Sequence, residues 1–215
     1  MSIKIVFFDC DGTLTKVKSS WEHIHKKLNI WESNADNYEK LFKEGRINYA
    51  EFCRRDAILW KGLALSEVLK IVGQIPYQEG AKETVTTLKE MGIYTVIIST
   101  GLSFVVDKAR DELGIHMSLS NELVTENGFL TGETVINVEY NRKGCWVEKI
   151  LNEMGIDRSE ACAIGDGEGD KGMFEAVSLS VGFHPCPSID PFLTHSIRNG
   201  FLSNMVDIIT DYNKG

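Results

Sequence analysis

The chain has 215 residues, of which 43% are hydrophobic and 25% charged, and its formal net charge is −8. This composition is ordinary for a folded globular protein, and an acidic surface argues against nucleic-acid binding, which needs a cationic face. No apolar run approaches the roughly 18 residues of a membrane-spanning helix, and the N-terminus runs directly into a predicted strand instead of a secretion signal. We therefore expect a cytoplasmic protein, monomeric or homodimeric, with no nucleic-acid or membrane partner.

The chain contains five cysteines, an odd number, and their spacing is not that of a metal site. Cys10, Cys145 and Cys162 lie inside apolar or periodic segments. We expect the cysteines to be buried or partly buried reduced thiols. Cys10 has no histidine near it in the sequence, which argues against a thiol nucleophile.

The first predicted elements are a strand and a long helical segment. The continuous apolar run of residues 3–8 predicts a strand buried on both faces, and the segment DCDGTL follows it. From about residue 16 the apolar spacing becomes helical, with Ser19 or Ser20 as a plausible N-cap and Gly62 and Gly73 as helix ends. We predict a helical cap of residues 16–75, inserted into a core of residues 1–15 and 76–215.

Strand and helix patterns alternate after Pro76. The expected helices cover residues 81–91, 104–113, 146–154 and 203–212, and the expected buried strands cover residues 94–99, 161–165 and 179–183. Asn127 and Gly128 predict a hairpin turn within residues 123–130. The alternation predicts an α/β fold: a three-layer, Rossmann-like core around a parallel sheet, with the helical cap and a β-hairpin flap added to it.

Polar residues follow three of the predicted strands. Ligands of such sheets bind beyond the carboxyl ends of the strands, where these side chains converge. Gly12 allows the chain to turn so that two nearby carboxylates reach one cleft. The residues concerned are Asp9 and Asp11, then Ser99 and Thr100, then Asp166 and Asp170.

These residue types suit phosphoryl transfer. Asp9 could attack a phosphorus atom and also bind a hard cation, while Asp11 could give a proton to the leaving alkoxide and take one from water. Mg²⁺ suits the site because it prefers oxygen ligands and neutralises phosphate charge, and Asp166 offers a third carboxylate. Asp170 could orient a metal-bound water or a lysine.

Further groups could hold the phosphate. Ser99 and the backbone amides of Thr100 and Gly101 can donate hydrogen bonds to its oxygens, and Lys143 adds a fixed positive charge. Each of these signals is weak alone. Their occurrence together and in this order predicts a phosphohydrolase that acts on a small phosphorylated metabolite.

The sequence resembles the haloacid dehalogenase-like (HAD) superfamily, whose four signature segments match DCDGTL, IISTG, Lys143 and GDGEGD. Within it, the helical insertion and the segments KEGRINY, PYQEGA, TENGFLTGE and AIGDGEGDKGMF resemble the phosphoserine phosphatase-like branch over nearly the whole chain. The resemblance implies that Asp9 forms an aspartyl-phosphate. It also implies that Asp9, Asp166 and the backbone carbonyl of Asp11 bind Mg²⁺.

The cap departs from the pattern of that branch. Phosphoserine phosphatases carry a Glu for the substrate ammonium and an Arg for its carboxylate, and ungapped counting puts Lys18 and Asp56 at these positions. The fourth motif has Gly169 where Asn is usual. Tyr49 matches an aromatic residue that covers the substrate.

The reversed charges lead to the hypothesis that the substrate is not chiefly phosphoserine. Opposed charges cost about as much as a bidentate ion pair contributes, a few kcal/mol when desolvated. A shifted register in the cap, or pairing of Lys18 with Asp56, would remove this argument. The alternatives are a genuine phosphoserine phosphatase, a phosphotransferase or mutase, and a non-catalytic metabolite-binding protein.

Overall fold

The computed structural model describes residues 2–31 and 35–215. The described residues form a seven-stranded sheet in the order β4-β3-β2-β1-β5-β6-β7, in which only the pair β3–β4 is antiparallel. The strands are β1 (Ile5–Phe8), β2 (Tyr94–Leu102), β3 (Met117–Glu126), β4 (Phe129–Val135), β5 (Ala161–Gly165), β6 (Leu179–Phe183) and β7 (His195–Ile197). The predicted α/β class with a parallel sheet is confirmed.

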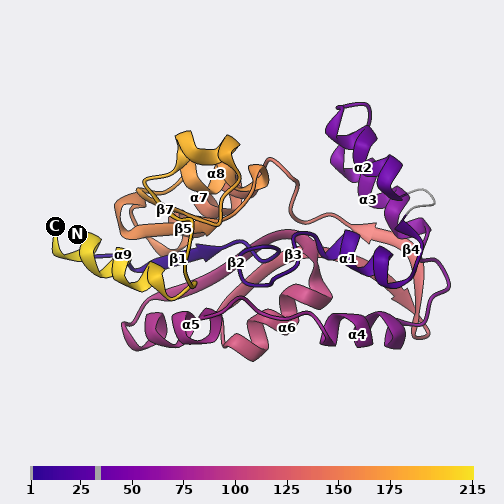
Figure 1. Cartoon of the computed structure of the whole chain (residues 1–215), viewed down its shortest axis with the longest axis horizontal. Helices are drawn as coiled ribbons and strands as arrows, with labels where there is room; N and C mark the ends of the chain where they lie inside the picture. The colour runs from indigo at the N-terminus through magenta and orange to yellow at the C-terminus, as the bar shows by residue number, and fades with distance from the viewer. Residues whose placement is uncertain (1, 32–34) are drawn as a thin grey trace.

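The sheet is covered on both faces, and β1 shows why. Successive side chains of a strand point to opposite faces. Val6 and Phe8 belong to one apolar cluster, and Ile5 and Phe7 belong to another. The first cluster includes residues of α5 (Ala81–Glu90), α6 (Ser103–Leu113) and α9 (Asn204–Lys214), and the second includes residues of α7 (Lys143–Met154) and α8 (Lys171–Glu175). Figure 1 shows α5 and α6 on one side of the sheet and α7 and α8 on the other.

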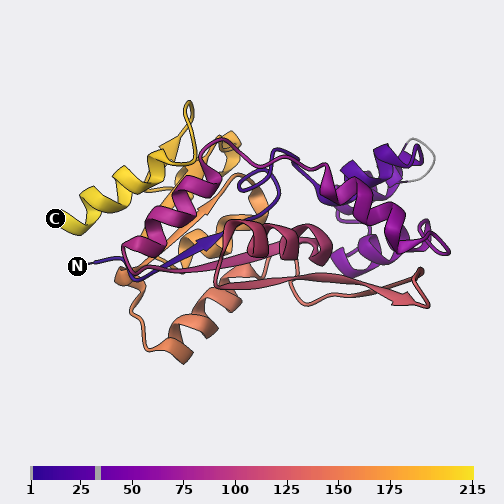
Figure 2. The same cartoon turned by 90° about the horizontal axis from the view of Figure 1, so that it is seen from below.

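Among the described residues, four α-helices lie between β1 and α5 in the chain and gather beyond the carboxyl end of β1 (Figures 1 and 2). They are α1 (Ser20–Lys27), α2 (Asp36–Lys43), α3 (Tyr49–Ile58) and α4 (Leu65–Gly73). Ser19 is the N-cap of α1, because its hydroxyl accepts a hydrogen bond from the Glu22 amide at 3.2 Å. We call this helical segment the cap. Residues 32–34 of the predicted cap lie outside the described residues.

The hairpin β3–β4 supports the cap. Leu130 exchanges backbone hydrogen bonds with the cap, accepting one from Gly62 at 2.8 Å and donating one to Leu63 at 2.9 Å, and the Leu65 amide donates to Gly128 at 2.9 Å. The predicted turn at Asn127 and Gly128 is confirmed, since both residues have positive φ angles. The strands extend well beyond residues 123–130, so the hairpin is a sheet extension under the cap.

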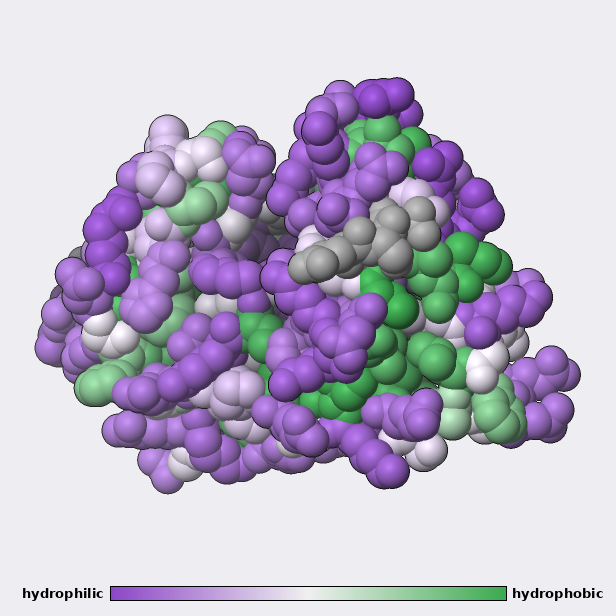
Figure 3. All heavy atoms as spheres, turned by 45° about the vertical axis from the view of Figure 1, so that its right-hand side comes forward, coloured by the Kyte–Doolittle hydropathy of each residue, from purple (hydrophilic) through white to green (hydrophobic). Residues whose placement is uncertain are grey.

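The space-filling view shows a recess between the lobe that carries α2 and α3 and the lobe that carries α7 and α8 (Figure 3).

Three features differ from the sequence predictions or complete them. The sequence analysis did not predict the three-residue strand β7, whose sequence is largely polar. All five cysteines are free thiols, but Cys145 is exposed, contrary to expectation. In the part of the chain that the structure describes, no helix is long and apolar enough to cross a membrane.

Candidate active site

The site lies where the strand order reverses, between β1 and β5. Successive strands add on one side of β1 up to β4, and β5 then starts on the other side. Phe8 pairs with Ile164, and the Asp9 amide donates to the Ile164 carbonyl at 2.9 Å. Asp9 and Asp166 therefore leave adjacent parallel strands at the same edge, which is the usual ligand position of such sheets.

A tight loop after β1 returns the chain toward this edge. The Cys10 carbonyl accepts hydrogen bonds from the amides of the three residues 13–15. Gly12 has a φ of +88°, and a Cβ there would lie 2.5 Å from Oδ2 of Asp166. Both the backbone conformation and the close approach require glycine.

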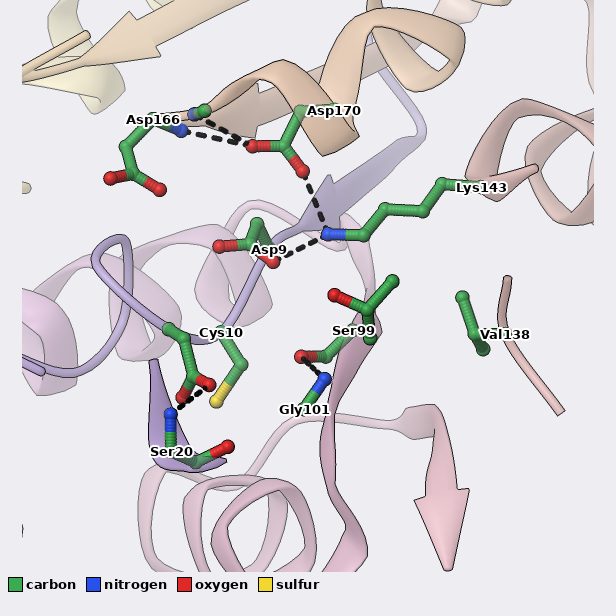
Figure 4. Close-up of polar contacts among 12 residues, drawn as sticks. Asp9, Cys10, Ser20, Ser99, Gly101, Val138, Lys143, Asp166 and Asp170 are labelled. Atoms are coloured by element: carbon green, nitrogen blue, oxygen red, sulfur yellow. Dashed lines mark hydrogen bonds and ion pairs between the residues drawn. The ribbon is translucent and has the colours of Figure 1, made fainter. Parts of the chain in front are cut away.

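Lys143 links two carboxylates at the floor of the site (Figure 4). Its Nζ lies 2.5 Å from Oδ1 of Asp9 and 2.7 Å from Oδ1 of Asp170, and the side chain is 2% exposed. Burial lowers the pKa of Lys143, but Asp170 and Asp9 raise it above its usual range. Burial raises the pKa of Asp9 well above its ordinary value, and Lys143 opposes that rise. Lys143 is thus a fixed cation beside the predicted nucleophile.

Both oxygens of Asp170 accept hydrogen bonds. Its Oδ2 accepts hydrogen bonds from the amides of Asp166 and Gly167, both at 3.1 Å, and its Oδ1 binds Lys143. Asp170 therefore orients the lysine and the loop after β5.

The three carboxylates fit a hard cation. Oxygen atoms of Asp9, Asp166 and Asp170 all lie within 4.8 Å of one another. Burial raises the pKa of Asp166 to about 6, although the ammonium of Lys18 contacts its Oδ2 and opposes the rise. A cluster of buried carboxylate oxygens, two of whose carboxyl groups (Asp9 and Asp166) have pKa values raised by burial, is a donor set suited to a divalent ion such as Mg²⁺.

Asp11 faces the same cavity. Its Oδ2 accepts a hydrogen bond from the Ser20 amide at 2.7 Å, while its buried Oδ1 has no hydrogen-bond partner. Burial raises the pKa of Asp11, and the bonds from Ser20 oppose this. A raised carboxyl pKa suits a group that must give and take a proton.

The predicted phosphate-binding residues lie at the end of β2. The pairing of β2 with β3 shifts between Ile98 and Leu102, so these residues form an irregular end of β2, which continues past the predicted end at residue 99. Ser99 Oγ accepts a hydrogen bond from the Gly101 amide at 3.0 Å. A Cβ at Gly101 would lie 2.8 Å from Oδ2 of Asp11, so this close approach also requires glycine.

Asn121 is a buried polar residue that sequence analysis missed. Its Nδ2 donates to the Thr100 carbonyl at 3.1 Å, to Oη of Tyr49 at 3.2 Å and to the Val138 carbonyl at 3.0 Å. Tyr49 also donates to the Thr100 carbonyl at 2.7 Å. Asn121 thereby connects the cap, the end of β2 and the segment before α7. No local pattern marks it, because its partners are far away in the sequence.

The cavity has a volume of about 240 Å³ and is bounded by both lobes. The sequence-predicted residues that line it are Asp9, Asp11, Lys18, Tyr49, Ser99, Thr100, Gly101, Lys143, Asp166 and Asp170. Gly169 lines it as well.

Asp56 does not line the cavity, which contradicts the position we expected for a specificity residue. Its side chain is fully buried inside the cap, with Oδ2 3.5 Å from Nε2 of His25. Lys18 contacts Asp166, so Lys18 and Asp56 do not pair with each other. The charge at position 56 therefore lies inside the cap and not at the cavity wall.

Comparison with known proteins agrees with this geometry. The family model for haloacid dehalogenase-like hydrolases matches residues 6–175. The chain belongs to this family. It is 32% identical to the phosphoserine phosphatase of Methanocaldococcus jannaschii over 84% of this chain and 85% of that protein. It is 28% identical to that of Polaromonas sp., over 96% of this chain and 89% of that protein.

Solved structures of HAD phosphatases are similar over almost the whole chain. A phospho-aspartyl intermediate analogue of a phosphoserine phosphatase and a substrate-bound phosphoserine phosphatase complex both align with a TM-score of 0.85 and 28% identity. Each alignment covers 97% of this chain and 99% of the other. The chain is therefore a phosphatase of the phosphoserine phosphatase-like branch. These relatives do not support the hypothesis of an altered substrate.

Proposed function

We propose that the chain is a Mg²⁺-dependent phosphomonoesterase that forms an aspartyl-phosphate on Asp9. The observation that carries the proposal is the different hydrogen bonding of the two oxygens of the Asp9 carboxylate. Lys143 binds Oδ1, whereas no described residue donates a hydrogen bond to Oδ2, and Asp9 lines the cavity. One oxygen is thus held in place while the other is available to attack.

The neighbouring groups supply the rest of the reaction. An oxygen of Asp9 bonds to phosphorus as the ester P–O bond breaks, and Asp11 gives its proton to the leaving alkoxide. Water then attacks phosphorus, Asp11 takes its proton, and the bond to Asp9 breaks to release inorganic phosphate. Ser99, the Thr100 amide and Lys143 hold the phosphoryl oxygens, and the Gly101 amide orients Ser99 through the hydrogen bond to its Oγ. Mg²⁺ bound by Asp9, Asp166 and the Asp11 carbonyl would neutralise phosphate charge.

We propose L-phosphoserine as the substrate. The named relatives support it, and the position of Asp56 removes half of the charge argument against it. A different small phosphorylated metabolite is the second candidate, because Lys18 lines the cavity and is cationic.

The test compares wild type with Asp9→Asn on p-nitrophenyl phosphate with Mg²⁺, then on a panel of phosphorylated metabolites. We expect Asp9→Asn to lower kcat by at least about 1,000-fold, because the nucleophile is lost. Equal rates in both proteins would contradict the covalent mechanism. A panel led by a compound other than L-phosphoserine would favour the second candidate.

A further inference from the structure

The cap presents few charged groups to the cavity. Among the described cap residues that line it, the charged ones are Lys18, Glu39 and Lys43. Lys18 comes from the segment before α1 and contacts Asp166 at the floor. Glu39 and Lys43 both come from α2. A substrate with its phosphate at Asp9 therefore has these groups available for its other end.

The other cap charges near the expected recognition positions are already paired elsewhere. Asp56 lies against His25 inside the cap. Arg54 and Arg55 both bind Glu51, with Nε–O distances of 2.8 and 2.7 Å, and none of these three lines the cavity. The arginines next to position 56 thus do not replace a carboxylate-binding Arg.

Glu39 and Lys43 form an exposed ion pair on α2. Nζ of Lys43 lies 2.8 Å from Oε1 of Glu39, and the side chains are 68% and 31% exposed. Such an exposed ion pair contributes little to stability, so a ligand can replace it at small cost.

Phe42 orients this face of α2. Its ring stacks on Phe52 with centroids 5.3 Å apart and meets Tyr140 edge-on at 5.2 Å. Tyr140 precedes α7 in the core, so Phe42 holds α2 against the opposite side of the cleft. Glu39 lies three residues before Phe42, and positions three or four apart share a helix face.

We propose that Glu39 and Lys43 recognise the amino-acid end of the substrate, with the ammonium at Glu39 and the α-carboxylate at Lys43. The inference rests on the proposed phosphoserine phosphatase function. A zwitterion carries the same two charges as the pair that it separates, so each charge regains a partner of opposite sign. Recognition that relatives place at positions 18 and 56 would thus have moved to α2.

The test measures kcat/KM for Glu39→Gln and Lys43→Gln on three substrates. These are L-phosphoserine, 3-phosphoglycerate (a hydroxyl replaces the ammonium) and phosphoethanolamine (no carboxylate). We expect Glu39→Gln to lower kcat/KM about tenfold or more for L-phosphoserine and phosphoethanolamine, through KM, and to leave 3-phosphoglycerate unchanged. Lys43→Gln should lower kcat/KM for L-phosphoserine and 3-phosphoglycerate and leave kcat/KM for phosphoethanolamine unchanged.

The matched control is Lys40→Gln on the same helix. Lys40 is 74% exposed, lies 3.9 Å from Glu44 and does not line the cavity. Lys40→Gln should leave kcat and KM unchanged for these three substrates and for p-nitrophenyl phosphate.

Three outcomes would overturn the inference: an unchanged KM for L-phosphoserine, an equal loss on every substrate, or a wild type that does not prefer L-phosphoserine to p-nitrophenyl phosphate. In each case, a loss of activity in Asp9→Asn would still support the proposal that the chain is a phosphomonoesterase that acts through Asp9. Activity that survives in Asp9→Asn would instead remove the proposed mechanism.

Discussion

The floor and the mouth of the cleft are built differently. We define the floor as Asp9, Lys143, Asp166 and Asp170, and the mouth as Lys18, Glu39 and Lys43. The floor side chains are 2–11% exposed, whereas those of the mouth are 31–68% exposed. Lys143 binds two carboxylates at once in the floor, while the mouth holds one exposed pair and the contact of Lys18 with Asp166.

This difference separates chemistry from recognition. Removing Lys143 from the floor leaves two buried carboxylates without a cation, so both stability and catalysis constrain this residue. Removing Glu39 or Lys43 from the mouth leaves an exposed charge in water, which costs little. The mouth can therefore change, as at Lys18, while the floor keeps the family pattern.

The largest expected effect comes from Lys143→Met. Asp9 and Asp170 would then face each other without a buried cation. We expect kcat to fall by about 1,000-fold or more, and the free energy of unfolding in EDTA to fall by about 3 kcal/mol. Phosphatase assays and urea denaturation measure the two effects.

The control for this variant is Lys149→Met, also on α7. Lys149 is 56% exposed and lies 3.9 Å from Glu153, so its loss should change neither quantity. A Lys143→Met protein as stable as the wild type would show that the lysine does not neutralise the floor.

Asp166→Asn should change the free energy of unfolding by a smaller amount than Lys143→Met does, and in the opposite direction. Burial raises the pKa of Asp166 from 3.8 to about 6, so the folded protein binds this proton more tightly than the unfolded chain does. The carboxylate therefore destabilises the metal-free protein as pH rises from about 4 to 6. Asn removes that charge, and we expect Asp166→Asn in EDTA at pH 8 to be about 1–3 kcal/mol more stable than wild type.

The advantage of Asp166→Asn should shrink as pH falls below 6, because the wild-type carboxylate then takes up its proton. Adding Mg²⁺ should raise the thermal midpoint of the wild type and not that of the variant. Thermal unfolding with and without Mg²⁺ across this pH range measures both effects. If the variant were less stable than the wild type at pH 8 in EDTA, the charged carboxylate of Asp166 would not destabilise the metal-free protein, contrary to our expectation.

The floor was predictable because its residues follow strands in short motifs. The apolar run before DCDGTL and the one before GDGEGD place Asp9 and Asp166 at strand ends, and parallel strands bring those ends together. Lys143 needed the family resemblance as well, since alone it is one lysine among many. The fold class followed from the same alternation of strands and helices.

The cap positions were less predictable because helix rotation and distant partners decide them. Counting placed position 56 on a helix, and α3 does cover it, but its side chain turns inward to His25 of α1. Asn121 was missed for a similar reason, since its hydrogen bonds join three separate segments. Local patterns carry no information about such contacts.

The smallest expected effect on activity tests the cap directly, at Asp56. Nε1 of Trp60 donates to Nδ1 of His25 at 3.1 Å, so the ring proton lies on Nε2, which faces Asp56. Asp56→Ala would remove the carboxylate that lies 3.5 Å from this nitrogen and leave a cavity inside the cap, so it should lower the free energy of unfolding by about 1–3 kcal/mol. Asp56→Asn keeps an oxygen there and should cost less.

Both variants should keep kcat/KM for L-phosphoserine within about threefold of wild type, because Asp56 does not line the cavity. Urea denaturation and steady-state kinetics on the same preparations separate the two properties. A stable Asp56→Asn protein with a strongly altered KM would restore Asp56 as a specificity residue. Lost stability with unchanged kinetics would instead show that Asp56 serves the packing of the cap and not the recognition of the substrate.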